Sequence, residues 1–300
     1  MIRHRFALRE IKRRRVGALH TNMIAVNLPA DSGRARNLTP SELERFKRDG
    51  LLTGFQLYSA SRAAVTRAAL QQVLSSPSAA PCHQVFPPEE RLVFDRHLDS
   101  RLIYELCTLP QVIGPVTQIL GDDVMLFKSQ FFEKPPHGRE IPWHQESYFW
   151  RKKGWVTMWL AVDDATAENG ALRVITGSHA ETREHLPLSP GTRYWSTFTH
   201  AAIQDESDPV VDCSMPAGNF MLFDDLLHNS GYNSSALPRL SFTARYARPD
   251  FAGAHELAPY PDHGCVLVSG KKEGSVLRFL PAPAAGPGLA DIWDRPETVL

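Results

Sequence analysis

Two side chains that can hold a metal ion lie two residues apart in the stretch IPWHQESYFW, residues 141–150. They are His144 and Glu146. If the stretch is a strand, both side chains lie on one face and converge on one point. An imidazole nitrogen and a carboxylate oxygen are two of the three ligands in the 2-His-1-carboxylate set that suits Fe(II). A substrate-reading pair and an exposed pair at a strand edge are the alternatives.

A third ligand is available further along the chain. Among the 12 histidines, His228 lies in FDDLLHNSGYNSS, where it ends an apolar strand and enters a turn rich in Gly, Asn and Ser. This position predicts that its ring faces the mouth of a barrel. A structural or surface histidine is the alternative.

A possible anion site follows His228. Arg239 comes eleven residues later, and Ser241 follows it in the sequence PRLSF. Residues two apart on a strand share one face, so the guanidinium and the hydroxyl can both donate to one carboxylate. A buried Arg without an anion is costly, so the pattern predicts an anion site if the strand is internal. A surface Arg on an edge strand is the alternative.

These residues must be positioned by helices that come first in the chain and strands that follow. A capping box and a terminal glycine predict a helix over residues 38–50, and an apolar stripe predicts another over 61–76. Residues 99–121 are predicted to form two short helices. The predicted strands cover residues 124–136, 154–164, 171–179, 219–231, 239–250 and 264–270. This order indicates an α+β chain with an antiparallel β core flanked by N-terminal helices.

The composition is that of a soluble globular protein, with 43% apolar and 22% charged residues. A net charge of zero gives no support to a nucleic-acid or membrane partner. No apolar run approaches the roughly 18–20 residues that span a bilayer. We therefore expect neither a nucleic-acid nor a membrane partner. The chain is expected to act as a monomer or homodimer.

The cysteines and the N-terminus bear on the compartment. The four cysteines are far apart and form no CxxC pair, which predicts free thiols in a reducing cytoplasm. They are Cys82, Cys107, Cys213 and Cys265. Residues 1–37 are rich in Arg and lack the apolar segment of a secretory signal, so we expect a solvated basic extension. A transit peptide is the alternative.

The chain resembles the phytanoyl-CoA dioxygenase (PhyH) family of Fe(II)/2-oxoglutarate-dependent oxygenases. The resemblance rests on the stretches WHQES, WLAVDDATAENGALRVITGSH, PAGNFMLFDDLLHNSGYNSS and PRLSFTARY. It extends from about Leu38 to about Pro249, and its most specific parts include the spacing of eleven from His228 to Arg239. It implies a double-stranded β-helix, or jelly-roll, core. We expect one oxygenase domain over residues 38–300.

The resemblance also implies a role for each candidate residue. His144, Glu146 and His228 would hold Fe(II) and form the catalytic centre. Arg239 would bind the distal carboxylate of 2-oxoglutarate. The other residues expected near this cosubstrate are Ser241, Ser230, Trp159, Lys128 and Gln130. If the strand 124–136 alternates regularly, Lys128, Gln130, Phe132 and Lys134 share one face. A solvated lysine at the strand end is the alternative for Lys134.

In that family, 2-oxoglutarate and O2 occupy the metal positions that the protein leaves open, and 2-oxoglutarate becomes succinate and CO2. The resemblance thus implies Fe(II), 2-oxoglutarate and O2, with ascorbate helping to keep iron reduced. We expect hydroxylation of an unactivated C–H bond of a small molecule, in specialised biosynthesis rather than general lipid breakdown. Desaturation, cyclisation and epoxidation start from the same chemistry and stay open.

Glu146 departs from the family pattern, which usually has Asp at that position. Its extra methylene means that the carboxylate must fold back to reach the same metal. We expect a tolerated ligand, and the carboxylate argues against halogenation, which needs a small residue there. A non-catalytic jelly-roll binding protein with a degenerate metal site is the alternative function. A metal hydrolase or cupin-type enzyme is a third, although HQES is not the HExxH motif of zincins.

A lid and the pocket walls are expected from the irregular stretch 180–215 and from nearby aromatic residues. A long irregular segment within a compact domain is often a lid. The candidate wall residues are Tyr148, Phe149, Trp150, Tyr194, Trp195 and Phe198, with ordinary packing as the alternative. The cluster RKKG, residues 151–154, either meets an anionic substrate or forms a solvated turn.

Overall fold

The computed structural model describes residues 36–78, 92–189, 194–195, 198–251, 264–275 and 277–294. Cys82 and nearly all of the expected basic extension lie outside these residues, so both expectations stay predictions. The other three cysteines are buried free thiols. Within the described part of the chain, no helix has both the length and the apolar character needed to cross a bilayer.

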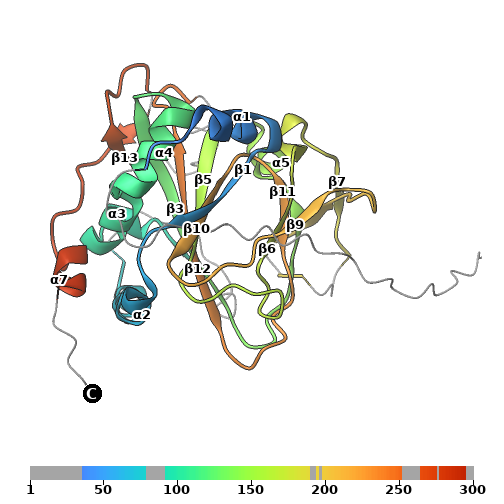
Figure 1. Cartoon of the computed structure of the whole chain (residues 1–300), viewed down its shortest axis with the longest axis horizontal. Helices are drawn as coiled ribbons and strands as arrows, with labels where there is room; N and C mark the ends of the chain where they lie inside the picture. The colour runs from blue at the N-terminus through green and yellow to red at the C-terminus, as the bar shows by residue number, and fades with distance from the viewer. Residues whose placement is uncertain are drawn as a thin grey trace, which may run out of the picture.

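A large sheet forms the centre of the fold (Figure 1). Its strand order is β1-β10-β5-β12-β3-β13-β14, and β2 also pairs with β3. The strands are β1 (Leu51–Gln56), β2 (Leu92–Phe94), β3 (Val124–Lys134), β5 (Trp155–Ala161), β10 (Asn219–Phe223), β12 (Arg239–Ala247), β13 (Gly264–Ser269) and β14 (Arg278–Phe279). The central pairs, in which β12 lies between β5 and β3, are antiparallel.

A smaller antiparallel sheet faces the large one across the candidate site, with the order β4-β11-β6-β9. Its strands are β4 (Ile141–His144), β6 (Leu172–Ile175), β9 (Val210–Asp212) and β11 (Leu227–Ser230). A separate pair consists of β7 (His185–Pro187) and β8 (His200–Ala202). Two facing antiparallel sheets are what the expected jelly-roll core requires.

Helices cover the side of the large sheet that faces away from the small sheet (Figure 1). These helices are α1 (Pro40–Asp49), α2 (Ala60–Ser75), α3 (Arg101–Thr108), α4 (Pro110–Leu120) and α7 (Leu289–Trp293). Helix α5 (Glu146–Trp150) instead lies beside the cavity between the sheets. The capping box predicted for α1 is present, because Thr39 and Glu42 exchange hydrogen bonds, and Gly50 ends the helix with φ at +70°. The predictions of two helices within residues 99–121 and of α2 are also confirmed.

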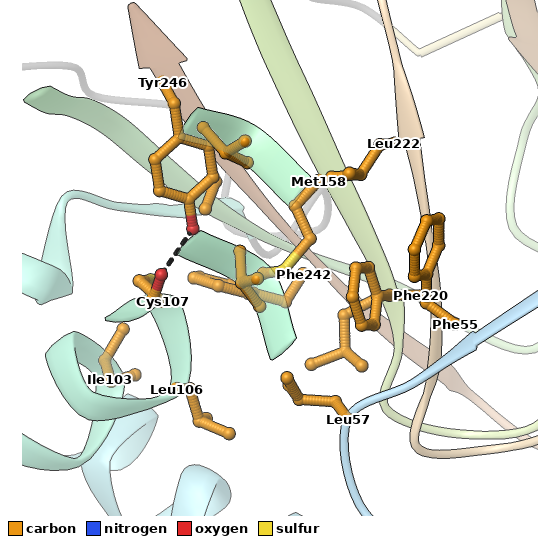
Figure 2. Packing of buried hydrophobic residues seen from close by; sticks show 14 of the residues in the cluster. Phe55, Leu57, Ile103, Leu106, Cys107, Met158, Phe220, Leu222, Phe242 and Tyr246 are labelled. Atoms are coloured by element: carbon orange, nitrogen blue, oxygen red, sulfur yellow. Dashed lines mark hydrogen bonds between the residues drawn. The ribbon is translucent and has the colours of Figure 1, made fainter. Parts of the chain in front are cut away.

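Strand β12 separates the apolar core from the candidate site by simple alternation. Leu240, Phe242, Ala244 and Tyr246 pack into the core beneath the helices, and Figure 2 shows two of them there. Alternate residues of the same strand, from Arg239 to Arg245, line a cavity on the opposite face. All nine residues of β12 are buried, so it is an internal strand with both faces covered. The alternative of Arg239 as a surface residue is therefore wrong.

Two expected strands are not continuous. Residues 219–231 form β10 in the large sheet and β11 in the small sheet. The chain crosses between the sheets at Asp224, whose N–H donates to the carbonyl of Gly50 at 2.9 Å, while its carbonyl accepts from Leu226 at 2.6 Å. Residues 141–150 also divide, because β4 ends at His144 and α5 begins at Glu146. The expectation that His144 and Glu146 share one strand face is therefore wrong.

Tyr246 connects the core to the end of helix α3. Its hydroxyl donates to the carbonyl of Cys107 at 2.7 Å, in a fully buried position (Figure 2). The last four carbonyls of a helix have no partner within the helix. This hydrogen bond therefore satisfies a carbonyl that water cannot reach.

We expect the substitution Tyr246→Phe to lower the free energy of unfolding by about 1–3 kcal/mol, because it leaves a buried carbonyl unsatisfied. Urea denaturation of the metal-free protein measures the change. The matched control is Tyr232→Phe, at a side chain that is 45% exposed. Equal midpoints for Tyr246→Phe and the wild type would contradict the prediction.

Candidate metal centre

Three side chains that can ligate a metal come together between the two sheets. They are His144 at the end of β4, His228 on β11 and Glu146 in the first turn of α5. One ligand atom from each lies within 4.8 Å of the other two. The two histidines are directly opposite in the β4–β11 pair, and their ring centroids are 4.1 Å apart. The expected ligands are thus within reach of one ion.

Each of these histidines is oriented by its own backbone. His144 Nδ1 lies 2.8 Å from the carbonyl oxygen of Pro142, and His228 Nδ1 lies 2.7 Å from that of Leu226. Because a carbonyl only accepts, both Nδ1 atoms carry the proton and both Nε2 atoms keep a lone pair for a metal. Burial lowers the pKa of both rings, to about 3 for His144, where the neighbouring His228 adds to the effect. Both rings are therefore neutral near pH 7, as metal ligands must be.

Gln145, between the first two ligands, fixes the turn from strand to helix. It is completely buried. Its amide nitrogen lies 3.0–3.1 Å from three backbone carbonyl oxygens, those of Ser178, Glu181 and Asp225. Its amide oxygen accepts the backbone N–H of Arg183 at 2.9 Å. These contacts tie both sides of the turn to other segments, so the positions of the flanking ligands are set before any metal binds.

Glu146 forms an ion pair with Arg245 of β12, on the facing large sheet. The pair uses Oε1 of the carboxylate and leaves Oε2 for a metal. Burial alone would raise the pKa of the Glu146 carboxyl, but the Arg245 guanidinium opposes this effect, and the pKa is lowered to about 2. Glu146 is therefore ionised and held in place. Its longer side chain reaches the two histidines from a helix start rather than from their sheet.

Asp225 supports the first turn of α5 from the connection between β10 and β11. Its Oδ1 accepts the backbone N–H of Ser147 at 2.9 Å. Its Oδ2 lies 3.9 Å from the Lys153 ammonium and has no hydrogen-bond partner among the described residues. Burial raises the pKa of Asp225 to about 7, because the ionised form is poorly compensated.

Arg239 is the first residue of β12 and lies in the cavity, at the opposite end of this strand from Arg245. Its side chain is completely buried, and its Nε and Nη1 atoms have no hydrogen-bond partner among the described residues. Its guanidinium lies 5.5 Å from the ring centre of Trp159, and burial lowers its pKa to about 10. Ser241 and Ser230 line the same cavity, and the Ser230 hydroxyl donates to the carbonyl of Gly170 at 2.7 Å. A buried guanidinium with unused donors is a site for a planar anion.

The ligands and Arg239 share one cavity of about 220 Å³. This volume is below the roughly 300–1,000 Å³ typical of pockets for drug-sized ligands, so it suits small molecules. All the residues expected near the cosubstrate line it: Arg239, Ser241, Ser230, Trp159, Lys128 and Gln130. Lys128 lies opposite Arg245 in the β3–β12 pair, whereas Gln130 lies opposite Thr243.

Lys134 is not the solvated lysine of the alternative interpretation. It is completely buried at the end of β3. Its ammonium donates to the carbonyl of Arg139 at 3.0 Å, to that of Ser230 at 3.3 Å, and also to that of Gly231. Burial lowers its pKa well below the ordinary value. Lys134 therefore joins the large sheet to the end of β11 instead of facing solvent.

The aromatic candidates divide between wall and packing roles. Phe149, Trp150 and Phe198 line the cavity, and the ring of Phe198 lies 4.8 Å from that of His144. Tyr148 instead stacks on His185, with ring centres 4.0 Å apart. Trp195 packs 6.2 Å from Phe132 and 5.9 Å from the Lys134 ammonium, whereas Tyr194 forms an isolated bridge with Glu140.

Arg245, Thr243 and Gln145 are site residues that the sequence reasoning missed. The alternation that identifies Arg239 and Ser241 continues through Thr243 to Arg245 on the same strand. The same alternation, continued from Ser241 through Thr243, predicts that Arg245 lies on the same face. No comparable signal exists for Gln145, because its partners come from distant parts of the chain.

Residues 46–241 match the family model described as Phytanoyl-CoA dioxygenase (PhyH). The matched range includes the three expected ligands, Arg239 and Ser241. The chain belongs to this family. The predicted class of enzyme is confirmed: an Fe(II)- and 2-oxoglutarate-dependent dioxygenase that consumes O2.

Known proteins of this kind resemble the chain over most of its length. It is 25% identical over 262 residues to an ectoine dioxygenase of Streptomyces avermitilis, covering 74% of this chain and 88% of that protein. It is 30% identical over 176 residues to the L-proline trans-4-hydroxylase of Streptomyces griseoviridis, covering 51% and 66%. The solved structure of CytC3 with Fe(II) and alpha-ketoglutarate matches with a TM-score of 0.61 at 22% identity, covering 82% and 95%. The jelly-roll fold is thereby confirmed.

We expect Asp225 to make this dioxygenase less stable as pH rises. The Asp225 carboxyl has a pKa of about 7 in the folded protein, against an ordinary value of 3.8. Between these two pH values the folded state therefore binds a proton that the unfolded state has released. The stability that this proton contributes is present below pH 4 and is lost as pH rises through 7. Asp225→Asn removes the ionisation while its oxygen can still accept from Ser147. The melting temperature of the metal-free variant, minus that of the wild type, should therefore increase from pH 5 to pH 8.

The matched control is Asp122→Asn, at an exposed carboxyl outside the site. A difference for Asp225→Asn that stays flat across this pH range would contradict the prediction.

Proposed function

We propose that this dioxygenase holds Fe(II) with His144, Glu146 and His228, anchors 2-oxoglutarate with Arg239 and Ser241, and hydroxylates a C–H bond of a small molecule. The observation that carries the proposal is the completely buried Arg239 guanidinium, whose Nε and Nη1 lack partners among the described residues. It lies in the same cavity as the ligand triad.

The cost of burying Arg239 supports this assignment. Removing a guanidinium from water costs several kcal/mol unless an anion or hydrogen-bond acceptors compensate. The distal carboxylate of 2-oxoglutarate provides two acceptor oxygens that match the planar fork of the guanidinium. Trp159 covers one face of the guanidinium, which keeps its edge directed into the cavity.

The metal, when bound, supplies redox chemistry with O2 that no protein side chain can perform. The residues of the chain orient and protect it. The two histidines present neutral Nε2 atoms, and Glu146 presents an ionised oxygen held by Arg245. The aromatic wall residues Phe149, Trp150 and Phe198 limit access of water to the cavity.

A complete triad favours catalysis over the non-catalytic alternative. A degenerate site would be expected to lack a ligand or to have one turned away. Here all three donors converge, and Glu146 differs from Asp in length but not in chemistry. Hydroxylation is the proposed outcome, and specialised biosynthesis is the proposed setting.

We further propose that residues 180–215 act as a lid, in a cytoplasmic enzyme that is a monomer or homodimer. The described part of this stretch includes Phe198, which lines the cavity, and the β7–β8 pair, which lies against β4. The buried free thiols of Cys107, Cys213 and Cys265 are compatible with a reducing compartment.

Arg239→Met should raise the dissociation constant for 2-oxoglutarate by at least about 30-fold, because truncating a charged partner of this kind costs about 2–5 kcal/mol. Methionine fills much of the same volume. Calorimetric titration of 2-oxoglutarate into anaerobic Mn(II)-loaded protein measures the change. Arg67→Met, at a residue paired with Asp163, is the matched control. An unchanged dissociation constant would place the cosubstrate carboxylate elsewhere.

His228→Ala should abolish stoichiometric Fe(II) binding and succinate formation while the protein stays folded, because one of three ligands is lost. Metal content after anaerobic loading and circular dichroism are the two measurements. His137→Asn is the control, since His137 is exposed and Asn tolerates its φ of +57°. A variant that retains full iron occupancy would remove His228 from the ligand set.

A further inference from the structure

Lys128 and Arg245 bring two cationic groups to the end of the cavity that lies away from Arg239. The two residues are directly opposite in the β3–β12 pair, and their charged groups lie 5.6 Å and 5.2 Å from the ring centre of Trp150. Arg239 is six residues away along the strand, which corresponds to about 20 Å between Cα atoms at 3.4 Å per residue. The Arg239 carboxylate site and this cation pair are therefore separate.

Two cationic side chains, Lys128 and Arg245, therefore face this end of the cavity, and Glu146 pairs with Arg245. A carboxylate that enters here would be attracted by both cations, because the interaction between charges is stronger away from bulk water.

Arg245 has donor capacity left for that anion. Its Nη2 binds Glu146, and its Nη1 lies 3.5 Å from the hydroxyl of Thr243. Its Nε is buried and has no hydrogen-bond partner among the described residues. Arg245 is only 4% exposed, so this nitrogen is not compensated by bulk solvent.

Apolar walls surround the cation pair. Phe94 lies 5.2 Å from the Lys128 ammonium, and Leu92, Phe149 and Trp150 line the same cavity. These walls suit an apolar body, whereas Lys128 and Arg245 suit an anionic head group. The exposed RKKG cluster, residues 151–154, provides no such enclosure.

We propose that the substrate is a small organic acid. Its carboxylate binds to Lys128, with the Arg245 guanidinium beside it, and the apolar body of the acid packs against the aromatic walls. This inference rests on the proposed function, because it takes the Arg239 end as occupied by 2-oxoglutarate. Lys128 is thereby a specificity-determining residue rather than a cosubstrate ligand. Arg245 acts both as the partner of Glu146 and as the second cation at the head group.

The test uses matched pairs of probes that differ in charge and not in shape: cyclohexanecarboxylate with cyclohexanecarboxamide, and L-proline with L-prolinamide. Each is titrated into anaerobic full-length protein loaded with Mn(II) and 2-oxoglutarate. Paramagnetic broadening of the probe's proton signals measures binding near the metal. At least one acid should bind at least tenfold more tightly than its amide. Equal binding within both pairs, or no broadening by any probe at millimolar concentration, overturns the proposal.

Substitutions at Lys128 assign the preference to this residue. Lys128→Met should reduce acid binding at least tenfold and leave amide binding unchanged, whereas Lys128→Arg should retain the preference. Lys152→Met, at an exposed lysine, is the matched control and should behave as the wild type. Acid binding by Lys128→Met equal to that of the wild type would overturn the assignment.

The affinity for 2-oxoglutarate separates this inference from the proposed function. Under the proposal, calorimetry shows unchanged 2-oxoglutarate affinity in Lys128→Met and a large loss in Arg239→Met. If Lys128→Met loses 2-oxoglutarate and Arg239→Met does not, the cosubstrate occupies the Lys128 end and both assignments fail. If both variants behave as predicted toward 2-oxoglutarate but acids show no preference, only the substrate inference fails.

Discussion

Burial of β12 on both faces is the constraint on which the site depends. Strand alternation puts Leu240, Phe242 and Tyr246 into the helix-covered core, and it therefore puts Arg239 and Arg245 between the two sheets. Two guanidiniums cannot be enclosed there without anions. One of them is compensated within the chain by Glu146. Arg239 keeps two buried donors without partners among the described residues, so the proposed function assigns the cosubstrate carboxylate to its end of the cavity and the metal to the Arg245 end.

The ion pair with Arg245 also explains how a glutamate serves at a position where the family usually has aspartate. Because α5 begins at Glu146, the residue does not extend from the same strand as His144. Glu146 therefore reaches the two histidines from the start of a helix, with one more methylene than Asp has. Arg245 restricts the longer side chain by holding one oxygen, which leaves the other to complete the triad. The divergence from the family is thus matched by a partner on the opposite sheet.

Much of the fold could be predicted because its signals are local. The cap of α1, the proline at the start of α4 and the alternation of β12 each specify an element within a few residues. The candidate ligands were found for the same reason, since residue type and spacing suffice. Lys134, Gln145 and the break at Asp224 could not be found in this way. Their conformations depend on carbonyls from distant segments, and no periodic pattern indicates such contacts.

The buried polar contacts outside the triad have one physical role in common, which is to keep backbone fixed around an electrostatically demanding centre. Gln145 joins the turn between the ligands to Ser178 and Asp225. Lys134 joins β3 to the end of β11, the strand that bears His228. Each satisfies carbonyls that irregular backbone would otherwise leave unpaired inside the protein. The cavity can therefore hold its cationic side chains in a defined geometry, because these contacts fix the backbone around it.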